Sequence, residues 1–246
     1  MLARQCVLWS GGKDSFLAYL LSRRNADDSF VFVTFVPRFG FFHCHPLPIL
    51  IEHGKYFEVP HEFIVIDEHD WVDSYRKAFA SLKMRYNIDR IISGDIFSCS
   101  THGTFWLAGV PAFHLSLPEW LASLQSLGLE FEAPLSTLYA EEIINLLCRY
   151  RIHAVITGLS CEWFSEGLLG KPLSMALLKS SSLYSDPRFD LCGERGEYHT
   201  TVIRFENKIF CDTDLDQLEP KLVNGIWALS WDMGWLNQAI TRRYVS

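Results

Sequence analysis

The sequence predicts an α/β protein in which a doubly wound parallel sheet is followed by a smaller α+β part. Two observations lead to this expectation. As far as residue 159, short and continuously apolar runs alternate with longer segments of helical periodicity, the pattern of strands covered by helices on both faces. Beyond residue 159 this alternation stops, and a glycine-containing segment and shorter runs follow.

Five runs have the composition of buried strands. They are nearly continuous in apolar and β-branched residues, as expected for parallel strands between two helical layers. The predicted strands are Cys6–Trp9, Val31–Val36, Phe63–Asp67, Arg90–Ile96 and Ala154–Leu159.

Between these runs, apolar residues recur every three or four positions, which predicts amphipathic helices. The predicted helices are Asp14–Arg24, Leu47–Phe57, Trp71–Tyr86, Pro118–Leu127 and Ala140–Tyr150. Behind them we expect a helix near Leu173–Ser181, a strand pair over Asp190–Phe205 and a last strand within Gly225–Trp231. This places one α/β domain at residues 1–135, its last strand reaching to about residue 160, and a smaller α+β domain at residues 136–246.

The composition limits the function. The chain of 246 residues has 29 acidic and 22 basic side chains and a net charge of −7, so a broad basic face for nucleic acid is not expected. The most apolar stretch, Phe30–Phe42, is broken by Pro37 and Arg38, so no membrane span or membrane partner is expected. Seven scattered cysteines without a C-x-x-C pair indicate reduced thiols, and together with the lack of a signal-like start they predict a cytoplasmic protein.

The strongest motif lies between the first predicted strand and the first predicted helix, and it reads Ser10-Gly11-Gly12-Lys13-Asp14-Ser15. Two glycines allow a tight backbone turn, and the unpaired N–H groups of the helix start attract an anion. The hydroxyls and Lys13 add donors, whereas Asp14 would repel a bare phosphate and fits beside Mg²⁺ or as a helix-start residue. The motif predicts a site for a nucleotide with magnesium, where Lys13 faces phosphate and supports no core.

The simplest alternative is a glycine-rich turn with a capped helix, but a cap does not require Gly-Gly-Lys. Known phosphate motifs of other kinds are missing from the chain. The positions where a Walker A loop ending in Gly-Lys needs its first glycine hold Val7, Ile49 and Ser165, and no G-x-G-x-x-G occurs.

Two further segments carry polar residues. Ser93-Gly94-Asp95-Ile96 forms the carboxyl end of the fourth predicted strand, where open α/β sheets bind ligands. Asp95 is therefore a candidate for Mg²⁺ or a ribose hydroxyl, with a plain turn residue as the alternative. His43-Cys44-His45 alternates in direction along an extended chain, which disfavours a metal site; His43 or His45 is a candidate for contact with nucleotide or substrate.

The Ser10–Ser15 motif resembles the PP-loop of the N-type ATP pyrophosphatases. Gly94-Asp95-Ile96 and the segment Cys192-Gly193-Glu194-Arg195-Gly196-Glu197-Tyr198-His199-Thr200 resemble signatures of the diphthine-ammonia ligase family, as do Ala133-Pro134-Leu135 and Leu169-Gly170-Lys171. The resemblance covers roughly residues 5–210.

This resemblance implies an ATP-dependent amide ligase. ATP would be cleaved between its α and β phosphates, and AMP would activate a carboxylate for attack by ammonia. The cofactors implied are ATP and Mg²⁺, and the implied partner is elongation factor 2 carrying diphthine. Ser10, Gly11, Gly12, Lys13, Asp14, Ser15, Gly94 and Asp95 would bind the nucleotide.

Among these residues, Asp14 and Asp95 would hold the metal, and Lys13 would neutralise charge developing on pyrophosphate. Glu194 and Glu197 would act catalytically at the acyl-adenylate or orient ammonia. Cys192 is better interpreted as a small packed residue than as a nucleophile.

The chain also departs from the family. The segment Phe97–Leu117 has no counterpart of the charged helix that follows Gly-Asp-Ile there, and Ser136 replaces the tryptophan that follows Pro-Leu. Both departures concern acceptor recognition, so two other hypotheses remain open. One is the same chemistry on a small carboxylate or a tRNA base, and the other is an ATP-binding module without turnover.

Overall fold

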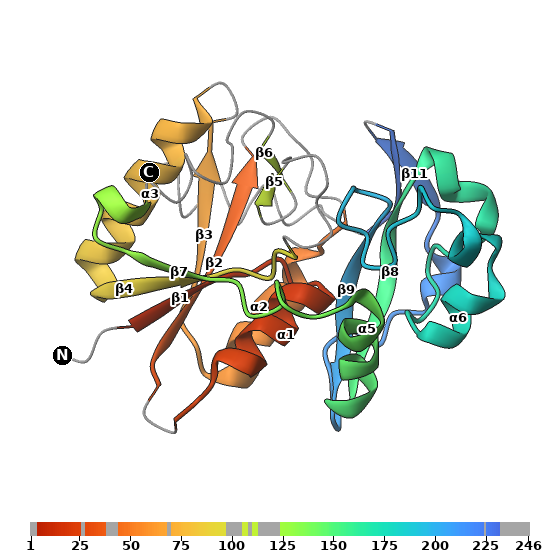
Figure 1. The fold of residues 1–246 in the computed structure, drawn as a ribbon, viewed down its shortest axis with the longest axis horizontal. Helices are drawn as coiled ribbons and strands as arrows, with labels where there is room; N and C mark the ends of the chain where they lie inside the picture. Colours follow the sequence, from red (N-terminus) through yellow and green to blue (C-terminus); the bar gives the residue numbers. More distant parts are fainter. Residues whose placement is uncertain are drawn as a thin grey trace.

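The computed structural model describes residues 4–25, 28–37, 44–67, 70–96, 105–107, 110–112, 124–223 and 225–231. Within these ranges the chain forms two five-stranded sheets and a two-stranded hairpin. Figure 1 shows the two larger sheets at opposite ends of the long axis, with α1 and α5 between them. The expected fold class, an α/β sheet followed by a smaller α+β part, is confirmed.

The first sheet is parallel and has the strand order β3-β2-β1-β4-β7. Its strands are β1 (Arg4–Leu8), β2 (Phe30–Pro37), β3 (His61–Ile66), β4 (Ile88–Ile92) and β7 (Glu130–Glu132). Four of them coincide with predicted strands. The fifth, β7, is a short edge strand with half-exposed residues, so it lacks the apolar run by which buried strands are recognised.

Helices cover this sheet on both faces: α1 (Lys13–Ser22), α2 (Leu47–Phe57) and α3 (Trp71–Tyr86). The bounds of α2 and α3 agree with the prediction, and each of these two helices ends at a left-handed residue, Glu58 and Asn87 respectively. Most of the predicted helix Pro118–Leu127 lies outside the described residues, although residues 124–126 are helical.

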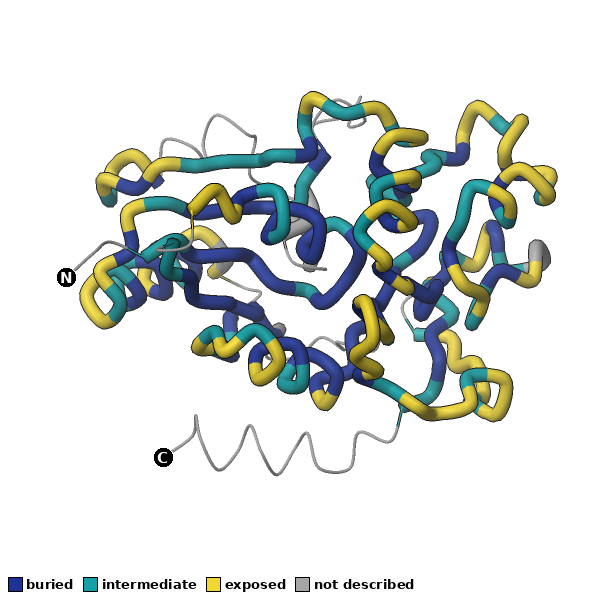
Figure 2. Tube along the Cα trace, turned by 90° about the horizontal axis from the view of Figure 1, so that it is seen from below, coloured by how far each residue is buried: buried dark blue, intermediate teal, exposed yellow. Residues whose placement is uncertain are grey.

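Alternate residues of β1 pack on opposite faces of the sheet. Val7 and Trp9 belong to the core under α1 and α2, whereas Cys6 and Leu8 belong to the core under α3. The first of these cores continues into the second sheet, and Figure 2 shows buried residues running from one sheet into the other. The two sheets therefore share one hydrophobic core.

The second sheet is antiparallel in its described pairings and has the order β10-β9-β8-β12-β11. Its strands are β8 (Ile152–Ser160), β9 (Tyr198–Phe205), β10 (Lys208–Ile209), β11 (Pro220–Val223) and β12 (Ile226–Leu229). The other elements of this part are the helices α5 (Ala140–Arg149) and α6 (Met175–Ser180) and the 3₁₀ turns η1 (Cys161–Glu166), η2 (Ser182–Ser185) and η3 (Leu215–Gln217). β5 (Phe105–Leu107) and β6 (Val110–Ala112) form the separate hairpin.

Two expectations for this region are wrong. The run Ala154–Leu159 was expected to be the last parallel strand, but it lies in β8, which pairs antiparallel with β9 and β12. β8 is buried on both faces along most of its length, as a parallel strand would be, so its apolar composition does not reveal the direction of its partners. The segment Asp190–Phe205 contains one strand instead of two, because residues 190–197 form turns before β9.

The division of the chain at residue 135 stays a prediction; the second sheet itself begins at Ile152. Among the described helices, none combines the length and the apolar composition required to cross a membrane.

Candidate functional site

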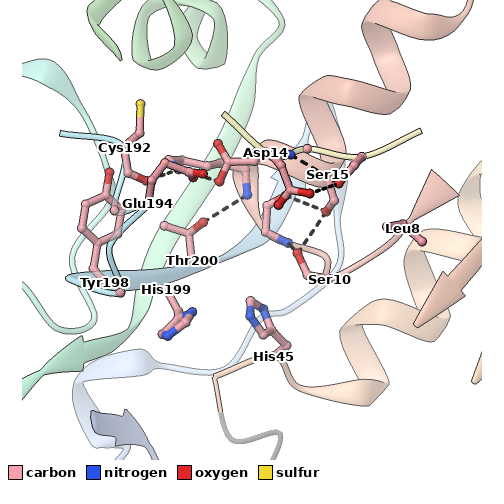
Figure 3. Close-up of a pocket in the computed structure, with 17 residues that line it drawn as sticks. Leu8, Ser10, Asp14, Ser15, His45, Cys192, Glu194, Tyr198, His199 and Thr200 are labelled. Atoms are coloured by element: carbon pink, nitrogen blue, oxygen red, sulfur yellow. Dashed lines mark hydrogen bonds and ion pairs between the residues drawn. The ribbon is translucent and has the colours of Figure 1, made fainter. Parts of the chain in front are cut away.

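A cavity of about 100 Å³ opens at the carboxyl edge of the parallel sheet, against the second sheet. Its walls come from the end of β1 and the start of α1, from residues 93–95 after β4, from His45, and from residues 192–194, 196 and 198–200. The carboxyl edge is where open α/β sheets bind their ligands. The site therefore combines both motifs that the sequence singled out, together with the loop before α2 (Figure 3).

The loop between β1 and α1 is tightly folded. Gly11 has φ +72°, a conformation that favours glycine, and the N–H of Gly12 donates to Ser10 Oγ at 3.3 Å. Ser10 Oγ lies 3.2 Å from Ser15 Oγ, so the two hydroxyls meet across the start of the helix. The Lys13 N–H donates to Thr200 Oγ1 at 3.0 Å. One of the amides at the helix N-terminus is thus already bound by β9.

Two glycines allow the backbones around the cavity to approach each other. A Cβ on Gly12 would lie 2.9 Å from the Thr200 carbonyl oxygen. A Cβ on Gly94 would lie 2.6 Å from the Asp14 carbonyl carbon and 2.7 Å from Ser15 N. Gly94 therefore packs the loop after β4 directly onto the first turn of α1, whereas the sequence suggested only nucleotide contact.

Lys13 is buried, with 1% of its surface exposed. Its Nζ donates to Asp14 Oδ2 and to the Cys192 carbonyl oxygen, each at 2.6 Å, and it lies 5.5 Å from the centroid of the Tyr198 ring. Burial by itself would lower the pKa of Lys13, but the attraction of Asp14 and Glu194 outweighs the effect of burial. The pKa of Lys13 is therefore raised above its usual value. The expectation that Lys13 supports no core is wrong, because its side chain connects α1 to the segment before β9.

Three carboxyl groups line the same cavity: Asp14 and Glu194, which both attract Lys13, and Asp95, which interacts with those two carboxyls. Burial raises the pKa of Asp95 to about 7, with a further contribution from Asp14, although Ser93 Oγ donates to Asp95 Oδ2 at 2.5 Å. Burial and the charge of Asp14 raise the pKa of Glu194, whose Oε2 accepts the Ile96 N–H at 3.1 Å. Burial also raises the pKa of Asp14. Such mutual repulsion among buried carboxyls is relieved by a cation.

The carboxyl groups of this cavity fit a magnesium ion whose coordination is completed by ligands from outside the chain. Asp14 Oδ1 is buried and has no hydrogen-bond partner among the described residues. Within the same residues, no group of three or more His, Cys, Asp or Glu side chains is arranged to hold a metal by itself. Mg²⁺ is commonly bound by one or two carboxylates together with substrate phosphates and water, so Asp14 and Asp95 are suitable ligands in such a site.

Glu197 does not line the cavity and is 4% exposed. Its Oε1 accepts the Asp190 N–H at 2.9 Å and its Oε2 accepts the Arg195 N–H at 3.0 Å, so both oxygens hold the turn before β9 in place. Burial raises the pKa of Glu197. The structure brings Glu194 to the other predicted site residues but directs Glu197 into its own loop.

A second part of the cavity is lined by two histidines that face each other in Figure 3. The rings of His45 and His199 are edge to face, with 5.7 Å between their centroids. Burial lowers the pKa of His45 to about 3 and that of His199 to about 4, so both imidazoles are neutral at pH 7. The hydroxyls of Thr157 and Thr201 donate to the Cys44 carbonyl at 2.6 and 3.0 Å, which fixes the chain beside His45.

Some of this site was accessible from the sequence. Ser10, Gly12, Lys13, Asp14 and Ser15 line the cavity together with Gly94, Asp95 and Glu194, all named as candidates. Cys192 is 2% exposed and burial raises its pKa, in agreement with a packed residue. The ring of Tyr198 and the imidazole of His199 were not predicted to be site groups, although their place beside Thr200 in the second motif was a usable signal. His43 lies outside the described residues.

The chain matches no protein-family model and no curated protein. Among solved structures it is similar to a predicted subunit of tRNA methyltransferase from Methanocaldococcus jannaschii, over 85% of this chain and 100% of that chain, with 16% sequence identity and a TM-score of 0.44. Similarity at this level identifies neither family nor activity. The fold and the cavity define an α/β protein with a charged pocket between two sheets. The residues of that pocket are what indicates its function.

Proposed function

We propose that the protein is an ATP-dependent enzyme of the PP-loop type that forms AMP and pyrophosphate. The observation that carries this proposal is the glycine-rich loop between β1 and α1, which borders a cavity at the carboxyl edge of a parallel sheet. A helix start, two serine hydroxyls and a lysine at such an edge are suited to a phosphate chain. Residues 93–95 line the same cavity directly beside the first turn of α1, in support of a nucleotide site.

Magnesium is part of the proposal. Asp14 Oδ1 and the Asp95 carboxylate would hold the ion, which supplies charge neutralisation to the phosphate oxygens when it is bound. When they are ionised, the carboxyl groups of Asp14, Asp95 and Glu194 carry more negative charge than Lys13 can neutralise. Mg²⁺ would supply the additional positive charge that a phosphate chain requires beside them.

The proposed reaction is amide formation in the cytosol, as the resemblance to diphthine-ammonia ligases implies. A carboxylate, by resemblance the diphthine side chain on elongation factor 2, would become an acyl-adenylate, and ammonia would displace AMP. What supports this choice is the common cavity of the PP-loop-like loop and the Cys192–Thr200 segment. Glu194 is the carboxylate of that segment that reaches the cavity, so it is the better candidate for proton transfer, and Glu197 is a positioning residue.

Product analysis tests the adenylation step. With ATP, Mg²⁺, ammonium and a diphthine-bearing acceptor, phosphorus NMR should show AMP and pyrophosphate, and mass spectrometry should show the amidated acceptor. ADP and phosphate as the main pair would reject adenylation, and AMP formation with a different carboxylate or a tRNA would retain the class but change the acceptor.

One variant and a matched control test the role of Glu194. Glu194→Gln should keep ATP affinity, because it preserves shape, and should slow amide formation by ~100- to 10,000-fold if Glu194 transfers a proton. Glu219→Gln, an exposed carboxylate in the same half of the chain, is the matched control. If Glu194→Gln instead abolishes binding of a non-hydrolysable ATP analogue, Glu194 belongs to the nucleotide site.

A further inference from the structure

The ammonium group of Lys13 occupies a site built for a nitrogen cation. Its two hydrogen-bond acceptors are Asp14 Oδ2 and the Cys192 carbonyl, at 2.6 Å each, and the face of the Tyr198 ring covers it at 5.5 Å from the centroid. A carboxylate, a carbonyl and an aromatic face are all groups that attract a cation with N–H donors. These three groups are called the cation cage here.

The charge around the cage exceeds what one lysine can neutralise. Glu194 and Asp190 both interact electrostatically with Tyr198 of the cage, and Asp95 interacts with Asp14 and Glu194. Lys13 is the only Lys or Arg among the described residues that line this cavity. If Lys13 left, the Asp14 carboxylate of the cage and the neighbouring Glu194 and Asp95 would have no lysine to balance their charge, which is a costly state for ionised groups.

Under the proposed function, the phosphates of the nucleotide would attract the Lys13 ammonium group out of the cage. Two of the three N–H donors of Lys13 are bound to Asp14 and Cys192, so only one is left for a phosphate oxygen, and a fuller contact with the phosphate chain requires Nζ to move out of the cage. A nucleotide that attracts the ammonium group towards its phosphates therefore empties the cage. Asp14 Oδ1 remains available for Mg²⁺, because the cage uses only Oδ2.

We infer that the cage of Asp14 Oδ2, the Cys192 carbonyl and the Tyr198 ring binds an ammonium ion, which passes one proton to the Glu194 carboxylate and as ammonia becomes the nitrogen donor of the reaction, and that Lys13 Nζ occupies this position in the nucleotide-free protein. This inference rests on the proposed amide-forming function. The lysine head group and ammonium share the same N–H donors and charge, so contacts that suit one suit the other. Ammonium would bind after the nucleotide, because the nucleotide opens its site.

Removal of the lysine tests the cage without any reaction. Lys13→Ala leaves Asp14 and the Cys192 carbonyl without their cation, so the variant should be less stable than the wild type. Ammonium chloride should then raise its melting temperature more than potassium chloride at the same concentration, by about 3–5 °C for each tenfold increase above the dissociation constant. Potassium is the control because it has the same charge but no N–H donors.

Two comparisons complete the experiment. Lys55→Ala, which removes an exposed lysine paired with Glu52, should show no ammonium-specific effect. Wild-type protein should show none on its own, but should show one when a non-hydrolysable ATP analogue and Mg²⁺ are bound. An equal response of Lys13→Ala to the two salts overturns the inference, and so does a variant that stays unfolded in ammonium as it does in potassium.

Failure of the cage and failure of the proposed function give different results. If the ATP analogue raises the melting temperature of the wild type but ammonium adds nothing to either protein, the nucleotide site stands and the cage is rejected. If the analogue has no effect while Lys13→Ala responds to ammonium, the cage is a cation site and the assignment to ATP chemistry is rejected.

Discussion

Acidification should destabilise the protein through a buried histidine that joins its two sheets. His53 on α2 is fully buried, and its Nε2 is 2.9 Å from the Val202 carbonyl of β9. Phe210 packs against its ring with 4.4 Å between centroids, and Trp9 and Phe16 lie at 5.6 and 5.3 Å. Burial in this aromatic surrounding lowers the pKa of His53 from 6.5 to about 3. The histidine therefore stays neutral in the folded protein where an unfolded chain would protonate it.

The size of the effect follows from the two pKa values. Because the folded pKa lies below the unfolded one, protons bind preferentially to the unfolded chain, and stability is lost as the pH falls from about 6.5 towards 3. At pH 5 the unfolded histidine is almost fully protonated and the folded one is not, which costs about 2 kcal/mol relative to pH 7.5. Any folded pKa below about 4 gives nearly the same loss at pH 5.

This loss can be measured by urea unfolding, followed by tryptophan fluorescence. The wild type and His53→Gln are compared at pH 7.5 and at pH 5.0. Gln can still donate an N–H to Val202 but does not titrate, so the wild type should lose about 2 kcal/mol more than the variant. His45, His61 and His199 titrate in the same direction in both proteins, and the difference isolates His53. His153→Gln, at an exposed position beside Arg204, should remain close to wild type. An equal loss in wild type and His53→Gln would refute the reasoning.

Two further predictions concern the packing around the cavity. Gly94→Ala should destabilise the protein by ~1–3 kcal/mol and weaken binding of an ATP analogue, because its methyl group would collide with the backbone of Asp14. Gly167→Ala is the control for binding: its methyl group meets no atom within 4 Å, but its positive φ costs about 1 kcal/mol of stability, so it should leave binding of the analogue unchanged. Equal weakening of binding in both variants would exclude the contact as the cause. Glu197→Ala should cost ~1–3 kcal/mol and expose residues 190–197 to proteolysis, because the partly buried N–H groups of Asp190 and Arg195 both lose their acceptor. Slow amide formation with an unchanged melting temperature would instead support a catalytic Glu197.

The sequence predicted the elements of the parallel sheet well because each has a local signal. The helix Leu47–Phe57 and the helix Trp71–Tyr86 were delimited correctly by their apolar spacing. The pairing of β8 could not be obtained in this way. A doubly buried strand looks the same in a parallel and an antiparallel sheet, and its neighbours β9 and β12 lie far along the chain.

The residues of the candidate site were likewise predictable only where the sequence carries a local signal. The Ser10–Ser15 loop and Asp95 were recognisable because glycine, lysine and carboxylate residues stand at predicted strand ends. Which groups of the second motif face the cavity depends on the fold of the turn before β9. There Glu194 reaches across to the Ile96 N–H, while Glu197 turns back onto the amides of Asp190 and Arg195. Sequence spacing alone assigns the two glutamates equal roles.

The bond from the Lys13 N–H to Thr200 joins residues 187 positions apart, and the Val202 N–H donates to the Gly11 carbonyl next to it. At ribosomal rates of ~5–20 residues per second, roughly 10–40 s pass between synthesis of the loop and synthesis of the strand that completes it. Throughout that interval Phe16 also lacks the Phe205 ring that later packs 5.2 Å from its own. The growing chain therefore carries an unfinished pocket and an uncovered aromatic surface until its last fifth emerges, a period in which protection by a chaperone would be of most use.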